Sequence, residues 1–99
     1  MIEGGTVQLP VRDVERALRF YIERLGVKLV QDAVLDLGAG FGVELVRADT
    51  VTPQTLVLYV RDFDEAIATY ENRGLVFTTD AKSAECTDLD GHHLRFVAR

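Results

Sequence analysis

A stretch of fourteen residues occurs twice in this chain, and this repeat constrains the fold more than any other feature. Residues 11–24 and 60–73 start 49 positions apart, and six of the fourteen positions are identical. The shared residues are the starting triplet Val-Arg-Asp, then an alanine, a tyrosine and an arginine. A repeat of this kind predicts one supersecondary unit that occurs twice. We expect the two copies to bury their apolar surfaces together, or with those of a second chain.

Each copy of the repeat is preceded by a segment in which apolar and other residues alternate. The apolar set is Val7, Leu9 and Val11 in the first segment and Leu56, Leu58 and Val60 in the second. The residues between them are Thr6, Gln8 and Pro10 in the first segment and Thr55, Val57 and Tyr59 in the second. A period of two predicts a strand with one packed face and one free face.

The repeated segments themselves predict helices, because apolar residues recur on one helical stripe in each. Asp13 and Asp62 stand where the N-caps belong, and Glu65 follows Asp62 at the capping-box spacing. Gly26 and Gly74 are expected to end the two helices. The stripes place Tyr21 and Tyr70, the repeated tyrosines, in the core or an interface.

Three short apolar segments follow each helix, so each half is predicted to run β-α-β-β-β. They are residues 27–30, 33–37 and 41–47 in the first half and 75–79, 84–87 and 93–97 in the second. We expect an α+β fold and a single domain over residues 1–99, with module 1 at 1–47, a linker at 48–54 and module 2 at 55–99.

Three passages carry a resemblance to a known family. They are Val11-Arg12-Asp13 with Phe20-Tyr21 and Leu25-Gly26, then Gly42-Val43-Glu44-Leu45, and the ending Asp88-Leu89-Asp90-Gly91-His92-His93-Leu94-Arg95-Phe96. The ending looks like the family pattern Asp-Pro-Asp-Gly-Asn-x-Ile-Glu-Leu. The chain resembles the vicinal oxygen chelate superfamily of glyoxalases, bleomycin-resistance proteins and extradiol dioxygenases. The resemblance implies a curved mixed sheet around a cup, with the helices on its outer face.

The resemblance also implies where metal-dependent members hold a divalent ion. The ligands come from the first and last strand of each module, and those positions hold Thr6, Glu44, Thr55 and Arg95 here. One carboxylate does not hold a transition metal against water, and a guanidinium repels one. We therefore expect no metal ligands, no metal and no other cofactor.

A rearranged metal set of Gln8, Glu44 and His93 is an alternative, because Gln8 and His93 share strand faces with Thr6 and Arg95. The simpler interpretation of His92 and His93 is two polar residues at the edge of a β-turn. Cys86 is expected to be a packed strand thiol rather than a nucleophile, since no histidine or aspartate spacing supports one.

Glu44 and Arg95 occupy equivalent places in the two modules, and the implied pseudo-twofold axis predicts that they approach each other. One interpretation is an ion pair in place of the metal. The other is that Arg95 orients an anionic or carbonyl-bearing ligand through its planar donor fork. Tyr59 is expected to face the cup, where it stacks on a planar ligand or fills space.

Composition excludes several classes of protein. The net charge of −5 argues against nucleic acid as a partner, because phosphate binding needs a basic face. No apolar run reaches the length of a membrane span, and no signal peptide is recognisable. The single cysteine fits a reducing cytoplasm, where we expect the protein to reside.

These observations predict a non-catalytic small-molecule binding protein similar to the bleomycin-resistance branch, working as a homodimer. The expected ligand-binding residues are Thr6, Gln8, Glu44, Thr55, Val57, Tyr59, His93 and Arg95. The alternative is a lyase, isomerase or epimerase with a rearranged site and Glu44 as a possible base. A third hypothesis is an interaction module whose cup serves dimerisation.

Overall fold

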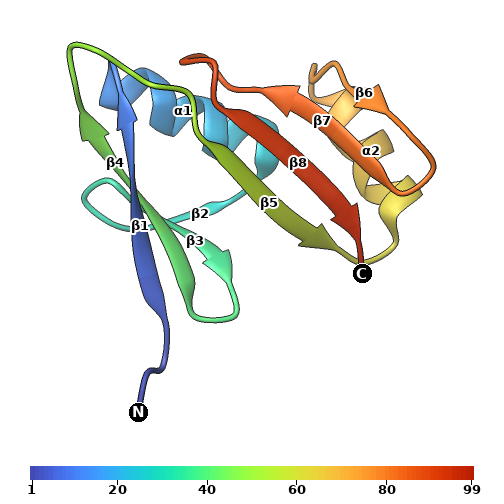
Figure 1. Cartoon of the computed structure of the whole chain (residues 1–99), viewed down its shortest axis with the longest axis horizontal. Helices are drawn as coiled ribbons and strands as arrows, with labels where there is room; N and C mark the ends of the chain where they lie inside the picture. Colours follow the sequence, from blue (N-terminus) through green and yellow to red (C-terminus); the bar gives the residue numbers. More distant parts are fainter. The chain divides into compact units, whose positions relative to one another are not determined.

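The two halves of the chain fold into two compact units with the same order of elements (Figure 1). The computed structural model describes all residues, 1–99, and the units are Met1–Thr52 and Pro53–Arg99. Unit 1 contains β1 (Gly5–Val11), α1 (Val14–Leu25), β2 (Lys28–Gln31), β3 (Val34–Gly38) and β4 (Phe41–Arg47). Unit 2 contains β5 (Thr55–Val60), α2 (Phe63–Asn72), β6 (Thr78–Thr79), β7 (Ser83–Thr87) and β8 (His93–Ala98). The predicted pair of β-α-β-β-β modules is confirmed.

Each unit holds one four-stranded mixed sheet, and the two sheets have equivalent topologies. The strand order is β1-β4-β3-β2 in unit 1 and β5-β8-β7-β6 in unit 2. The first strand pairs in parallel with the last strand, and the remaining pairs are antiparallel. Neither helix is long and apolar enough to cross a membrane.

One face of each sheet packs against the helix of the same unit. In unit 1 this face carries Leu9 and Val11 of β1 and Val43 and Leu45 of β4, all of which are buried, as is Tyr21 of α1. Burial of each such side chain stabilises the unit by roughly 1.5–3 kcal/mol. The predicted alternation is confirmed for these residues, although Val7 near the start of β1 stays half exposed.

In unit 2 the helix-side face is organised around Phe96 of β8. The Phe96 ring lies 5.1 Å from the ring of Tyr70 on α2 and 5.7 Å from the ring of Phe77, measured between centroids. Leu94 and Cys86 are buried on the same side of the sheet. This packing directs the side chains of His93, Arg95 and Val97, which alternate with Leu94 and Phe96, to the opposite face.

The two helix starts differ, and one capping prediction is wrong. Asp13 caps α1 as expected, because its Oδ1 accepts a hydrogen bond from the backbone N–H of Arg16 at 3.1 Å. Asp62 makes no side-chain cap bond, and its backbone is left-handed with φ of 46° and ψ of 59°. N-cap residues that form a capping bond have an extended backbone, so the left-handed backbone of Asp62 accounts for the missing bond. The helix ends agree better: Gly26 adopts the left-handed C-cap of α1, and Gly74, also at positive φ, follows the last turn of α2.

The strand predicted at residues 75–79 is shorter than expected. Only Thr78 and Thr79 pair with β7. The preceding Leu75 is buried, and its backbone N–H donates to the carbonyl of Tyr70 at 3.2 Å. Leu75 therefore packs at the end of α2. This apolar residue contributed to the predicted strand pattern, but it belongs to the helix end instead.

His92 is the clearest departure from the sequence-based interpretation. The residue does lie at the edge of the turn before β8, but its side chain is fully buried and serves as more than a polar turn residue. The ring atom Nδ1 accepts a hydrogen bond of 2.9 Å from the backbone N–H of Gln54, just before β5. Within the turn, Oδ1 of Asp88 accepts hydrogen bonds from the backbone N–H groups of Asp90 and His92, both at 2.9 Å. His92 thus joins the turn before β8 to the segment that leads into β5.

We predict that His92→Asn keeps most of the stability and that His92→Leu loses about 1–3 kcal/mol of unfolding free energy. Asn Oδ1 stands as many bonds from the backbone as His Nδ1, so it can accept the same hydrogen bond, whereas leucine leaves the Gln54 N–H without this partner. Urea denaturation followed by circular dichroism measures both. Equal loss in the two variants would show that ring packing, and not the hydrogen bond, is what matters.

Candidate functional site

The face of each sheet that points away from its helix carries all eight residues predicted to bind a ligand. We call this surface the open face. In unit 1 it includes Thr6 and Gln8 of β1 and Glu44 of β4, and Gln8 lies directly opposite Glu44 in the parallel register. The side-chain Nε2–H of Gln8 donates to Oε1 of Glu44 at 2.9 Å. The open face of unit 1 thus contains two polar side chains, Gln8 and Glu44, that are hydrogen-bonded to each other.

The open face of unit 2 mixes apolar, aromatic and charged side chains. Thr55, Val57 and Tyr59 project from β5, opposite His93, Arg95 and Val97 of β8. Tyr59 keeps 61% of its surface exposed and Val57 keeps 47%. The guanidinium of Arg99 lies 5.2 Å from the centre of the Tyr59 ring, a cation–π contact. These exposed side chains offer apolar and aromatic surface of the kind against which a planar molecule can stack.

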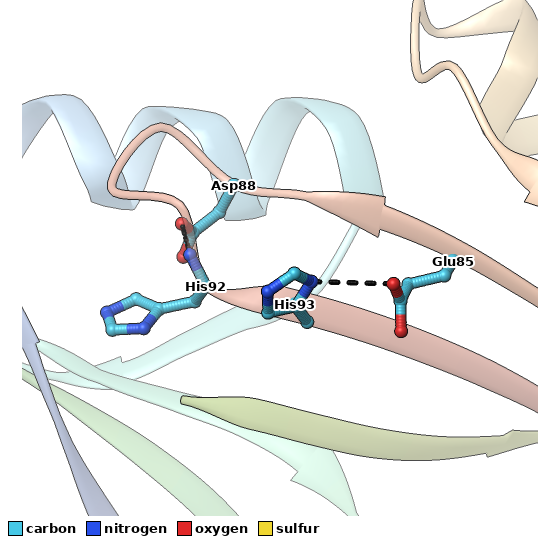
Figure 2. A network of polar contacts seen from close by, with 4 residues as sticks. All are labelled: Glu85, Asp88, His92 and His93. Atoms are coloured by element: carbon cyan, nitrogen blue, oxygen red, sulfur yellow. Dashed lines mark hydrogen bonds and ion pairs between the residues drawn. The ribbon is translucent and has the colours of Figure 1, made fainter. Parts of the chain in front are cut away.

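Glu85 is a site residue that the sequence analysis missed. It belongs to β7 and lies directly opposite Arg95 of β8 in the antiparallel register. Its carboxylate contacts the diagonal neighbour instead: Oε2 of Glu85 is 3.4 Å from Nδ1 of His93 (Figure 2). The only signal in the sequence is alternation: Glu85 stands between the apolar Ala84 and Cys86, as Arg95 stands between Leu94 and Phe96. Each therefore points away from the core side of its strand.

Arg95 consequently has no carboxylate within ion-pair distance in unit 2. Its one interaction there is a weak electrostatic effect on Asp80, which precedes β7. The pKa of Asp80 is lowered mainly by the backbone N–H of Lys82, then by the hydroxyl and N–H of Ser83, and least by the charge of Arg95. Arg95 is therefore an exposed cation, and no carboxylate of its own unit pairs with its guanidinium. The predicted pairing of Arg95 with Glu44 concerns two different units and stays a prediction.

The two adjacent histidines have opposite surroundings. Figure 2 shows the ring of His93 beside Glu85 and the ring of His92 directed away from it. Nδ1 of His93 is shielded from solvent and has no hydrogen-bond partner, so the Glu85 carboxylate is its nearest polar neighbour. A lone pair facing a carboxylate is repelled, so we expect the neutral ring of His93 to carry its proton on Nδ1. His92 accepts a hydrogen bond at Nδ1 and so carries its proton on Nε2.

The residues at the implied metal positions do not fit a divalent ion. Glu44 is the one charged oxygen ligand among them, and Gln8 presents its N–H donor to that carboxylate instead of adding an oxygen toward a shared cation. Arg95 takes the equivalent place in unit 2. Within each unit no three histidine, cysteine, aspartate or glutamate side chains lie close enough to hold a metal. The donor set thus lacks the three or four ligands that a transition metal needs.

Cys86 does not take part in the open face. It lies on the helix side of β7 and is buried, as the sequence predicts for a packed thiol. Burial, together with the negative charges of Asp88 and Glu85, raises the pKa of the thiol to about 11. The reactive thiolate is therefore scarce near neutral pH, which argues against nucleophilic chemistry at this residue.

Comparison with known proteins identifies the family. The model of the Glyoxalase/Bleomycin resistance protein/Dioxygenase superfamily matches residues 5–91, which cover the chain from β1 to the turn before β8. The chain belongs to this superfamily. The resemblance seen in the sequence is confirmed, and the description of the superfamily names glyoxalases, bleomycin resistance proteins and dioxygenases.

Solved structures share the fold of this superfamily member. A protein from the mobile metagenome of V. pseudocholerae superposes with a TM-score of 0.83 at 21% identity, covering 99% of this chain and 95% of that one. TnmS3, an antibiotic binding protein from Streptomyces sp. CB03234, superposes with a TM-score of 0.82 at 24% identity, covering 99% of this chain and 96% of that one.

A curated relative matches a shorter stretch. The polyribonucleotide nucleotidyltransferase of Trichormus variabilis is 43% identical over 63 residues, which make up 63% of this chain and 8% of that protein. The chain thus spans a small part of the length of the curated relative it matches.

We predict that the two histidines hold opposite neutral tautomers, Nε2–H in His92 and Nδ1–H in His93. Long-range ¹H–¹⁵N correlation spectra at pH 8 distinguish the two forms, because protonated and unprotonated ring nitrogens resonate far apart. Glu85→Leu should shift the pattern of His93 and leave that of His92 unchanged. The same tautomer in both rings would contradict the assigned surroundings.

Proposed function

We propose that the chain binds a planar small organic molecule that carries an acidic group, without a metal ion and without converting it. The observation that carries this proposal is Arg95, an exposed guanidinium with no ion-pair partner in its unit, beside the exposed side chains of Val57 and Tyr59. A guanidinium recognises a carboxylate through two parallel hydrogen bonds, which fixes the orientation of a planar acid.

The neighbours of Arg95 support the same ligand class. Val57 lies opposite Arg95 on β5, and Tyr59 is two residues further along that strand, so an aromatic ring bound by its acid group would lie over apolar surface. The remaining residues predicted for the site, Thr55 and His93, stand opposite each other one step before Val57 and Arg95 and add polar contacts. That TnmS3 is an antibiotic binding protein agrees with a role in ligand binding.

The acid requirement is tested with benzoate and its neutral analogue benzamide on protein treated with chelator. We expect benzoate to shift backbone amide resonances of β5, β7 and β8 in ¹H–¹⁵N spectra, and benzamide to bind about tenfold more weakly, because it cannot form the charge-assisted pair. Arg95→Ala should reduce benzoate affinity by the same factor.

Arg19→Ala is the matched control, since Arg19 is an exposed cation on α1. It should leave the benzoate affinity unchanged. Equal weakening by the two substitutions would mean that overall charge, not Arg95, attracts the acid. Turnover of either probe would instead favour the enzyme alternative.

A further inference from the structure

We infer that the site around Arg95 selects aromatic hydroxy acids, with the acid on Arg95 and a ligand hydroxyl donating to Nε2 of His93. This inference rests on the proposed function and adds a second recognition partner to it. The pair formed by Glu85 and His93 supplies that partner, and neither the family resemblance nor the implied metal positions includes Glu85.

The first step is the state of the His93 ring. Its Nδ1 atom is shielded from solvent and faces Oε2 of Glu85 at 3.4 Å, although the side chain as a whole is 44% exposed. The solvent-accessible part of the ring is therefore its other edge, which carries Nε2. With the proton on Nδ1, Nε2 has a lone pair and acts as a hydrogen-bond acceptor. The charge of Glu85 beside Nδ1 thus favours the tautomer in which Nε2 is the acceptor.

The second step is the distance between the two recognition groups. His93 and Arg95 are two residues apart on β8, and such residues lie on one face about 7 Å apart. Thr55 and Val57 of β5 lie opposite them and form the floor between. One aromatic ring with polar groups at its two ends can bridge this distance, whereas a short aliphatic hydroxy acid cannot.

The third step concerns the charges around the site. Glu85 lies beside His93, and Asp80 acts electrostatically on Arg95 from the segment before β7. Arg99 lies over Tyr59 at the other end of the face. A second acid at the His93 end of the ligand would meet the charge of Glu85, so the pair of Glu85 and His93 favours a neutral hydroxyl there over a carboxylate.

The test uses four probes that differ by one group: 4-hydroxybenzoate, benzoate, 4-hydroxybenzamide and terephthalate. Dissociation constants are measured from ¹H–¹⁵N shift changes in the chelator-treated full chain at pH 7.5. We expect 4-hydroxybenzoate to bind about tenfold more tightly than benzoate and than 4-hydroxybenzamide, and terephthalate to bind no better than benzoate.

Two substitutions assign the hydroxyl preference to the proposed pair. His93→Leu should bind benzoate as the unsubstituted chain does but no longer distinguish it from 4-hydroxybenzoate. Glu85→Gln should lose most of the preference, because an amide can face Nδ1 with its N–H and move the ring proton to Nε2. Glu71→Gln, at an exposed position on α2, is the control and should keep the preference for 4-hydroxybenzoate over benzoate. Well-dispersed spectra confirm that each variant is folded.

The outcomes separate this inference from the function on which it rests. Binding of benzoate with no gain from the hydroxyl would overturn the inference and leave the proposed function standing. Retention of the hydroxyl preference in His93→Leu would overturn it as well. Failure of every acid to bind would overturn both. A tenfold preference that depends on His93 and on Glu85 would support both.

Discussion

The pairing of the first strand with the last strand in each unit is the constraint on which the rest of the structure depends. Because the register is fixed and the side-chain period of a strand is two, burial of Leu9, Leu45, Leu94 and Phe96 against a helix determines which residues face the other way. A shift by one residue in either unit would place the charged residues in the core. The open faces are therefore a consequence of core packing and not a separate feature.

The same register makes the two units comparable position by position, and their chemistry differs. Where unit 1 places Gln8 opposite Glu44, unit 2 places Val57 opposite Arg95. The first pair is joined by a hydrogen bond within its own sheet. In the second pair an apolar side chain lies opposite a cation. The nearest strand partner of that cation, Glu85, has its carboxylate 3.4 Å from Nδ1 of His93 instead. Unit 2 is thus the half in which an exposed guanidinium has no carboxylate partner within its own sheet.

Sequence reasoning succeeded where the signal was periodic and local. Alternation along β1 and β5 and the helical stripes predicted both modules, and the cap at Asp13 followed from residue type. It failed where a backbone turn or a contact across strands decided the outcome. The left-handed backbone of Asp62 removed a cap, closure of α2 by Leu75 shortened a strand, and the hydrogen bond from Gln54 turned His92 inward. The role of Glu85 depends on its diagonal contact with His93. The spacing of residues along β7 predicts the face on which Glu85 lies, but it does not predict which neighbour its carboxylate contacts.

The central claim is that residues at the implied metal positions now serve a metal-free site. Calorimetric titration of the chelator-treated chain with Zn²⁺, Ni²⁺, Co²⁺, Mn²⁺ and Fe²⁺ tests it most directly. The account predicts no stoichiometric binding of any of these ions and no change in thermal stability. Tight binding of one ion per chain, lost on substitution of Glu44 or His93, would contradict it and would restore the rearranged metal set of Gln8, Glu44 and His93.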